Sequence, residues 1–139
     1  GDEVFPVRIS TQTYQYMQKM LAERSKTAPA KKLCLKGGGA NFYIDPSLVL
    51  YIETIEAKSI LHFLDKNITV NYKIGMLEKM FPDDFYRAHR SFLINTYYVM
   101  AIERYHITMN NGQIIPIPEK RYNEVKKALS KKLTDKINL

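Results

Sequence analysis

The most informative part of this sequence is Phe85-Tyr86-Arg87-Ala88-His89-Arg90-Ser91-Phe92-Leu93-Ile94-Asn95. It places three side chains that can carry positive charge within four positions, with aromatic residues on both sides. An arginine in such a place can donate two hydrogen bonds to a phosphate or to the O6 and N7 atoms of guanine. The alternative is structural, because Arg87 and His89 could alternate onto one face of a strand and bond to neighbouring backbone.

Strand signals continue on both sides of this stretch. Runs of β-branched and aromatic residues between turn residues predict strands at Ser91–Asn95 and Tyr98–Glu103 and a hairpin across Asn110-Asn111-Gly112. A short helix is predicted at Gly75–Met80. The upstream strands, of which the last two form a hairpin, are predicted at Lys32–Lys36, Ala40–Ile44, Ser47–Glu53, Ser59–Leu64 and Ile68–Lys73. The centre of the chain is therefore expected to be mostly β.

Helices frame this β region at both ends. Apolar stripes at helical spacing predict one helix at Thr11–Arg24 and a C-terminal helix from about Glu119 to Leu133. An extended segment precedes the first helix at Glu3–Val7, and Ser25–Lys31 has the composition of a linker. We therefore predict two parts. The first, residues 1–31, is the tail of an upstream domain or a helix that docks on the β region, and the second is residues 32–139.

Length and composition restrict the class of protein. With 139 residues, 45% apolar residues and one cysteine, the chain suits one globular domain without an internal disulfide. No apolar run approaches the roughly 20 residues that cross a bilayer, and no signal peptide is visible, so we expect a cytoplasmic protein that does not insert into membranes. The net charge of +7 favours a polyanionic partner, although residues 32–118 carry only +1 of it and solvated lysines would give the same total.

Residues that would indicate catalysis or metal binding are scattered. His62, His89 and His106 lie far apart, with no carboxylate or thiolate at a ligand spacing. Cys34 lies in an apolar strand, where a buried and inert thiol is expected. The glycines at 37–39 lack the Lys-Ser/Thr ending of a phosphate-binding loop and are better explained as a connection between strands. The sequence therefore predicts no enzyme, no cofactor and no metal site.

The order of these features resembles the LytTR family of DNA-binding domains over about Lys32 to Leu129. The specific part is the segment Phe-Tyr-Arg-x-His-Arg-Ser-Phe-x-x-Asn, and weaker matches in the family's order are Leu50–Glu53, Asn111-Gly112 and Ile115–Ile117. The resemblance implies small β-sheets with little helix. It also implies the output domain of a bacterial two-component response regulator, which regulates transcription by binding promoter repeats in double-stranded DNA through loops in the major groove. Residues 1–31 would then be the remnant of a receiver domain.

The resemblance further implies which residues contact DNA. The first and third of the three family loops depart from the family's pattern. The first reads Ile55-Glu56-Ala57-Lys58 without the Asn-Tyr often found there, and the third has Pro118-Glu119 where Ser-Arg is usual. The expected DNA-contacting residues are Glu56, Lys58 and Ser59 in the first loop, Arg87, His89, Arg90 and Ser91 in the second, and Lys120 and Arg121 in the third.

Two other functions stay open from the sequence. The β core could dock on a regulatory protein without touching DNA, in which case the basic residues only keep the chain soluble. RNA binding would need exposed aromatic side chains for base stacking, which Tyr86, Tyr97 and Tyr98 could supply, although burial is the more common outcome. The sequence also leaves open the target operator, the activating signal and whether a homodimer forms on direct-repeat sites.

Overall fold

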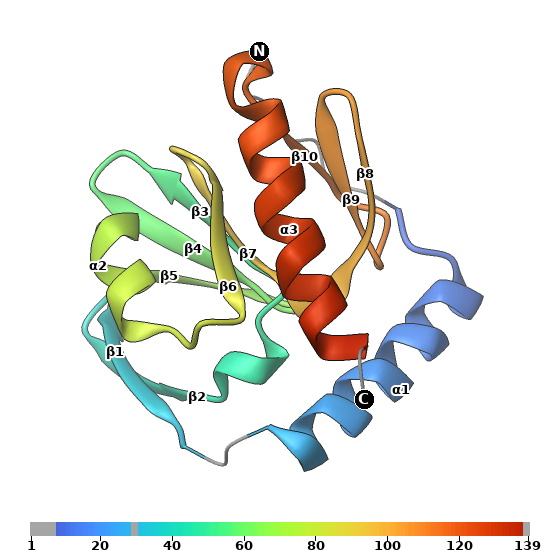
Figure 1. Ribbon diagram of the computed structural model, residues 1–139. Coiled ribbons are helices and arrows are strands. Elements are labelled where there is room, and N and C mark those ends of the chain that lie inside the picture. Colours follow the sequence, from blue (N-terminus) through green and yellow to red (C-terminus); the bar gives the residue numbers. More distant parts are fainter. Residues whose placement is uncertain (1–7, 29–30, 138–139) are drawn as a thin grey trace.

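The fold consists of small antiparallel sheets with a helix at each end of the chain, as the sequence predicts (Figure 1). The computed structural model describes residues 8–28 and 31–137, and the side chains as far as residue 133. The three sheets contain two, three and five strands. The short internal helix, α2, spans Ile74–Met80, close to the predicted Gly75–Met80.

The five-stranded sheet is the centre of the molecule, with the strand order β5-β4-β3-β7-β6. Its strands are β3 (Tyr51–Ile55), β4 (Lys58–His62), β5 (Asn67–Val70), β6 (Phe85–His89) and β7 (Phe92–Asn95). Every pairing in it is antiparallel, and the predicted hairpin across Asp65-Lys66-Asn67 is present as β4–β5. A tight turn joins β3 to β4, with Glu56 at a φ of 54°.

Two smaller sheets complete the β structure. The N-terminal hairpin pairs β1 (Leu33–Gly37) with β2 (Ala40–Ile44), and Gly38 and Gly39 in its turn both have positive φ angles, which glycine adopts without strain. The three-stranded sheet has the order β10-β9-β8 and contains β8 (Val99–Glu103), β9 (His106–Met109) and β10 (Ile114–Pro116). The predicted Asn-Gly turn joins β9 to β10, with Gly112 at a φ of 90°.

Each face of the five-stranded sheet covers its own core, because successive residues of a strand point to opposite faces. Tyr51 enters a core shared with the three-stranded sheet and the C-terminal helix α3 (Tyr122–Ile137), which we call the α3 core. Ile52, the next residue, enters a core shared with α2, which we call the α2 core. The α3 core includes Val125 and Leu129, two members of the apolar stripe expected for the C-terminal helix.

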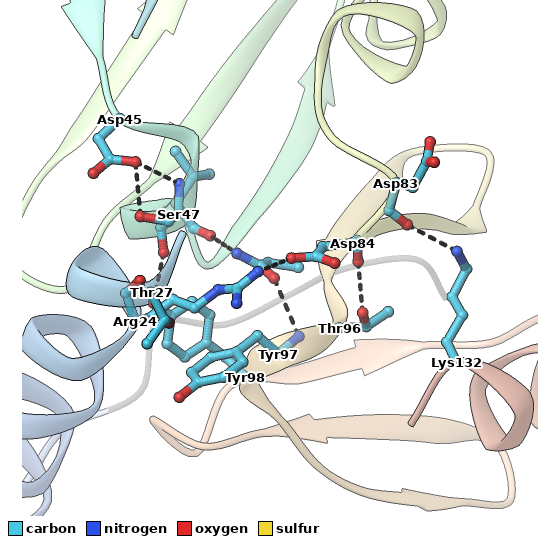
Figure 2. Close-up of polar contacts among 12 residues, drawn as sticks. Arg24, Thr27, Asp45, Ser47, Asp83, Asp84, Thr96, Tyr97, Tyr98 and Lys132 are labelled. Carbon is cyan, nitrogen blue, oxygen red and sulfur yellow. Dashed lines mark hydrogen bonds and ion pairs between the residues drawn. The ribbon is translucent and has the colours of Figure 1, made fainter. Parts of the chain in front are cut away.

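The N-terminal helix α1 (Thr11–Thr27) packs on this framework. Ser10 caps it, because its hydroxyl accepts a hydrogen bond from the backbone N–H of Thr13 (3.1 Å). Met17 is fully buried in the α3 core, and Arg24 forms an ion pair with Asp84 (Figure 2). The structure thus shows α1 docked on the β domain, while the predicted boundary at residue 31 stays a prediction.

Several expected boundaries differ from the structure. The expected strand at Ser47–Glu53 begins instead as a 3-10 turn at Pro46–Leu48, because the Asp45 carboxylate accepts hydrogen bonds from the backbone N–H and hydroxyl of Ser47 (2.9 and 2.7 Å; Figure 2). α1 continues through Thr27, into the predicted linker. The C-terminal helix is likewise preceded by a 3-10 turn at Glu119–Arg121. The expected extended segment Glu3–Val7 lies outside the described residues.

Cys34 is exposed, which corrects the expectation of a buried thiol. In β1 the residues Leu35 and Gly37 are buried. Cys34 lies on the opposite face of the strand and points outward. An added Cβ atom at Gly37 would lie 2.2 Å from the carbonyl oxygen of Thr69, so the inward face of β1 approaches the backbone of β5 closely at this point.

Candidate nucleic-acid interface

The three loops expected to contact DNA lie at one end of the molecule. The tips of the β3–β4 and β6–β7 hairpins and the first turn of α3 all point to the upper side of Figure 1, and the β8–β9 turn points the same way. Helix α1 lies at the opposite end in this view. Segments up to about sixty residues apart in sequence thus present one surface, which we call the loop face.

Hydrogen bonds tie these loops to one another. The backbone N–H of Thr54, in the β3–β4 hairpin, donates to the carbonyl oxygen of Ser91 in the β6–β7 turn (2.9 Å). The guanidinium of Arg121 donates to the carbonyl oxygen of Arg87 (3.3 Å), which links the segment before α3 to β6. The loop face is therefore one connected structure, and its side chains are held at fixed relative positions.

Arg87 shapes the β6–β7 turn. Its Nε and Nη2 atoms donate to the carbonyl oxygens of His89 (3.0 Å) and Arg90 (2.5 Å), and its Nη1 atom donates to Glu78 in α2 (3.1 Å). An arginine suits this role because its planar group offers several donors in fixed directions. The pairing of β6 with β7 shifts between Arg87 and His89, and the hydrogen bonds of Arg87 span this irregularity. Arg87 therefore bonds to neighbouring backbone, which is the structural alternative that the sequence left open for it.

His89 and Ser59 point inward. His89 is 3% exposed, its Nδ1 atom accepts a hydrogen bond from the backbone N–H of Ser91 (3.0 Å), and its ring lies 5.4 Å from that of Phe92. The Nδ1 atom is thus engaged with the backbone of the β6–β7 turn. Ser59 is fully buried, and its hydroxyl donates to the carbonyl oxygen of Tyr72 (2.7 Å). Both side chains therefore fasten backbone segments together.

The remaining expected residues reach the surface. Ser91 and Arg121 are half-buried, and the exposed members of the set are Glu56, Lys58, Arg90 and Lys120. Arg121 lies 3.6 Å from a Glu124 carboxylate oxygen. It also lies beside Tyr86, where burial raises the pKa of the Tyr86 phenol and the positive charge of Arg121 opposes that rise. Arg90 and Lys120 therefore present the most accessible positive charges among the expected residues of the second and third loops.

An open cleft of about 650 Å³ separates the second loop from the third. Its walls are the β6–β7 turn on one side and the segment from Pro116 to Arg121 on the other. Residues of the second loop that line it are Arg87, His89 and Arg90. The third loop contributes the Arg121 guanidinium and the Glu119 carboxylate, so the cleft offers both hydrogen-bond donors and an acceptor, as the edge of a base requires.

The structure adds a fourth segment that no sequence motif singles out, the β8–β9 turn. Tyr105 of this turn is 40% exposed, lines the same cleft and packs edge-on against Tyr122 (ring centroids 5.5 Å apart). The guanidinium carbon of Arg104 lies 5.8 Å from the Tyr122 ring centroid. The backbone N–H of Ile117 donates to the carbonyl oxygen of Tyr105 (2.9 Å), so this turn is joined to the third loop. The only sequence signal is an arginine beside a tyrosine directly after the predicted strand Tyr98–Glu103.

The loop face carries charges of both signs. Its exposed cations are Lys58, Arg90, Arg104 and Lys120, and its exposed carboxylates are Glu56, Glu103, Glu119 and Glu124. A surface of mixed charge binds a polyanion through particular contacts rather than through a uniform field.

Metal sites and membrane spans are both missing from the described part of the chain. Within residues 8–28 and 31–137, no group of three or more His, Cys, Asp or Glu side chains could hold a metal ion. No helix in those ranges is both long enough and apolar enough to cross a membrane.

Comparison with known proteins agrees with this geometry. Residues 39–130 match the model of the LytTr DNA-binding domain family. The sensory transduction protein LytT of Bacillus subtilis (strain 168) is 32% identical over 113 residues, and the match covers 77% of this chain and 47% of LytT, so the chain spans about half of that relative. A solved LytTr DNA-binding domain from Bacillus cereus superposes with a TM-score of 0.60 at 25% identity, covering 72% of this chain and 96% of that one. The chain belongs to the LytTr DNA-binding domain family.

Proposed function

We propose that this protein is a sequence-specific regulator of transcription that binds promoter DNA through the loop face. The observation that carries the proposal is the hydrogen-bonded connection between loops that bring Lys58, Arg90 and Lys120 to one end of the molecule, in a chain of the LytTr DNA-binding domain family. Loops held in fixed relative positions can place side chains in a groove without a large ordering cost on binding.

The proposed roles follow from exposure and donor geometry. Arg90 reads a base edge, because an exposed guanidinium can pair with the O6 and N7 atoms of guanine. Lys58 and Lys120 neutralise phosphates, which fixes position without reading sequence. Arg87 and His89 act as positioning residues for Arg90 through the backbone of the β6–β7 turn. The remaining expected residues, Glu56, Ser59, Ser91 and Arg121, border or support these contacts.

The wider regulatory context is part of the proposal. LytT is a sensory transduction protein of which the match covers only 47%, which supports a role as the output part of a longer response regulator. We further propose that two copies bind a direct repeat, with half-sites about one or two helical turns apart so that both lie on one face of the duplex.

The test begins with selection of bound duplexes from a random library, followed by affinity measurements on the recovered sequence. Arg90→Ala is expected to weaken binding by about 10-fold or more, the value of one good base contact. Lys19→Ala is the matched control, because Lys19 is an exposed cation on α1 at the opposite end of the molecule. The DNA affinity of this variant should equal that of the wild type. Recovery of no common sequence, or equal affinities for Arg90→Ala and Lys19→Ala, would contradict the proposal.

A further inference from the structure

The tip of the β3–β4 hairpin has a chemistry different from that of the other loops on the loop face. Ile55 ends β3 with 51% of its surface exposed, and the three residues after it, Glu56, Ala57 and Lys58, are also exposed. A single exposed isoleucine is common on protein surfaces and carries no meaning alone. Its position and its rigid support are what distinguish this one.

The backbone holds Ile55 beside the second loop. Ile55 pairs in register with Lys58 across the turn, and the preceding residue, Thr54, donates its backbone N–H to the carbonyl oxygen of Ser91 (2.9 Å). The turn between them is tight, with Glu56 in the left-handed region at a φ of 54°. The end of β3 that carries Ile55 is therefore held by β4 on one side and by the β6–β7 turn on the other.

Strand alternation shows which way Ile55 faces. Residues two apart in a strand share a face, so Ile55 lies on the same face of the sheet as Glu53. Glu53 pairs with Phe92, and Phe92 pairs with His89, which lines the cleft beside Arg90. Directly paired residues also share a face. Ile55 is thus on the cleft side of the sheet.

At this tip the side chains that can hydrogen-bond to a base edge are those of Glu56, which can accept from the N4 amino group of cytosine, and Lys58, which can donate to guanine. Arginine, asparagine and glutamine, whose planar groups pair with one base through two hydrogen bonds in a fixed geometry, are absent between residues 55 and 58. Ile55 and Ala57 offer only methyl and methylene groups, and Lys58 offers a point charge suited to phosphate. The one feature of the major-groove edge that an aliphatic side chain recognises is the C5-methyl group of thymine.

We infer that Ile55 packs against the C5-methyl group of a thymine in the major groove, an assignment that rests on the proposed function. The first loop then selects a T·A pair by apolar contact. A protein partner is disfavoured as the occupant, because Ile55 is followed directly by a carboxylate, a single methyl group and an ammonium group rather than by further large apolar side chains.

Substitution of deoxyuridine for thymine tests the inference, because it removes the methyl group and keeps every hydrogen-bonding atom. Each thymine of the selected duplex is replaced in turn, and affinity is measured by fluorescence anisotropy. One position is expected to weaken wild-type binding about fourfold, the effect of one buried methyl group. At that position Ile55→Ala should bind the thymine and deoxyuridine duplexes equally well.

Ile114→Ala is the matched control, because Ile114 is 49% exposed on β10. This variant should keep the wild-type preference for thymine. Tolerance of deoxyuridine at every position, or an unchanged thymine preference in Ile55→Ala, would overturn the inference while leaving the proposed function intact. Failure of the wild type to bind any duplex would instead overturn the proposed function, and this inference with it.

Discussion

Arg24 of α1 forms an ion pair with Asp84, sixty residues later in the chain (Figure 2). The Arg24 guanidinium also lies 4.8 Å from the centroid of the Tyr97 ring. The carbonyl oxygen of Asp84 accepts hydrogen bonds from the backbone N–H and the hydroxyl of Thr96 (2.9 and 2.6 Å). The turn before β6 is therefore a junction where α1 meets the β framework, although α1 lies outside the family match that begins at residue 39.

This ion pair should contribute measurably to stability. The Arg24 and Asp84 side chains are only 19% and 27% exposed, so water screens the pair less than it screens a surface pair. A double-mutant cycle of Arg24→Ala and Asp84→Ala is expected to give a coupling free energy of roughly 1–2 kcal/mol in urea unfolding. A cycle of Lys26→Ala and Glu23→Ala, an exposed pair at 4.0 Å, should give less than about 0.5 kcal/mol. Similar coupling in the two cycles would contradict the prediction.

Met17→Ala tests whether α1 is docked in solution. The side chain is fully buried in the α3 core, so its truncation should lower the free energy of unfolding by about 2–4 kcal/mol, through lost burial and the cavity that remains. Chemical denaturation monitored by circular dichroism measures the change. Lys19→Ala on the same helix is the control and should change the free energy of unfolding by less than about 0.5 kcal/mol. If Met17→Ala also changed it by less than about 0.5 kcal/mol, α1 would be detached from the β domain in solution.

Features set by local chemistry could be predicted from the sequence, and features set by distant contacts could not. The Asn-Gly turn before Gln113 and the helix ending at Met80 follow from residues within a few positions of each other. The exposure of Arg90 in a turn, and of Lys58 as the first residue after one, also follows from local sequence. The inward direction of His89, by contrast, depends on the register shift between β6 and β7.

The same distinction applies to the candidate site. The role of Arg87 depends on Glu78 in another element, which no local pattern reveals. Tyr105 joins the cleft because Tyr122, at the start of α3, packs against its ring. Cys34 is exposed because the opposite face of β1, with Leu35 and Gly37, is the one that packs inward. Each of these outcomes is a contact between segments that the sequence alone does not align.

Arg87→Lys separates positioning from charge. Lysine keeps the positive charge but cannot donate to Glu78 and to the carbonyl oxygens of His89 and Arg90 at the same time. DNA affinity should fall by about 10-fold, because Arg90 loses its support, while the dependence of affinity on salt stays as in the wild type. If Arg87 contacted phosphate directly, Arg87→Lys would keep most of the affinity and Arg87→Ala would flatten the salt dependence.

Lys120→Ala should alter the salt dependence itself. Each phosphate contact contributes about −0.9 to the slope of log affinity against log salt concentration for B-form DNA. Loss of the exposed Lys120 should therefore make the slope shallower by about one and weaken binding to all sequences alike. Titrations at several salt concentrations with specific and random duplexes measure both effects. A slope equal to that of the Lys19→Ala control would remove Lys120 from the interface.

Tyr98→Phe connects a buried hydroxyl to alkaline stability. The Tyr98 hydroxyl donates to the carbonyl oxygen of Ser47 (2.6 Å), and burial raises the pKa of the phenol above its ordinary value of 10.0. The folded protein therefore holds this proton to a higher pH than the unfolded chain does. The resulting stabilisation is complete below about pH 10 and is lost as the pH rises above that value.

Tyr98→Phe should lower the free energy of unfolding by about 1–2 kcal/mol at neutral pH, because the Ser47 carbonyl loses its hydrogen-bond partner. Between pH 10 and 12, the free energy of unfolding of this variant should fall less steeply with pH than that of the wild type. An equal alkaline decline in both proteins, followed by far-ultraviolet circular dichroism, would show that Tyr98 does not control it.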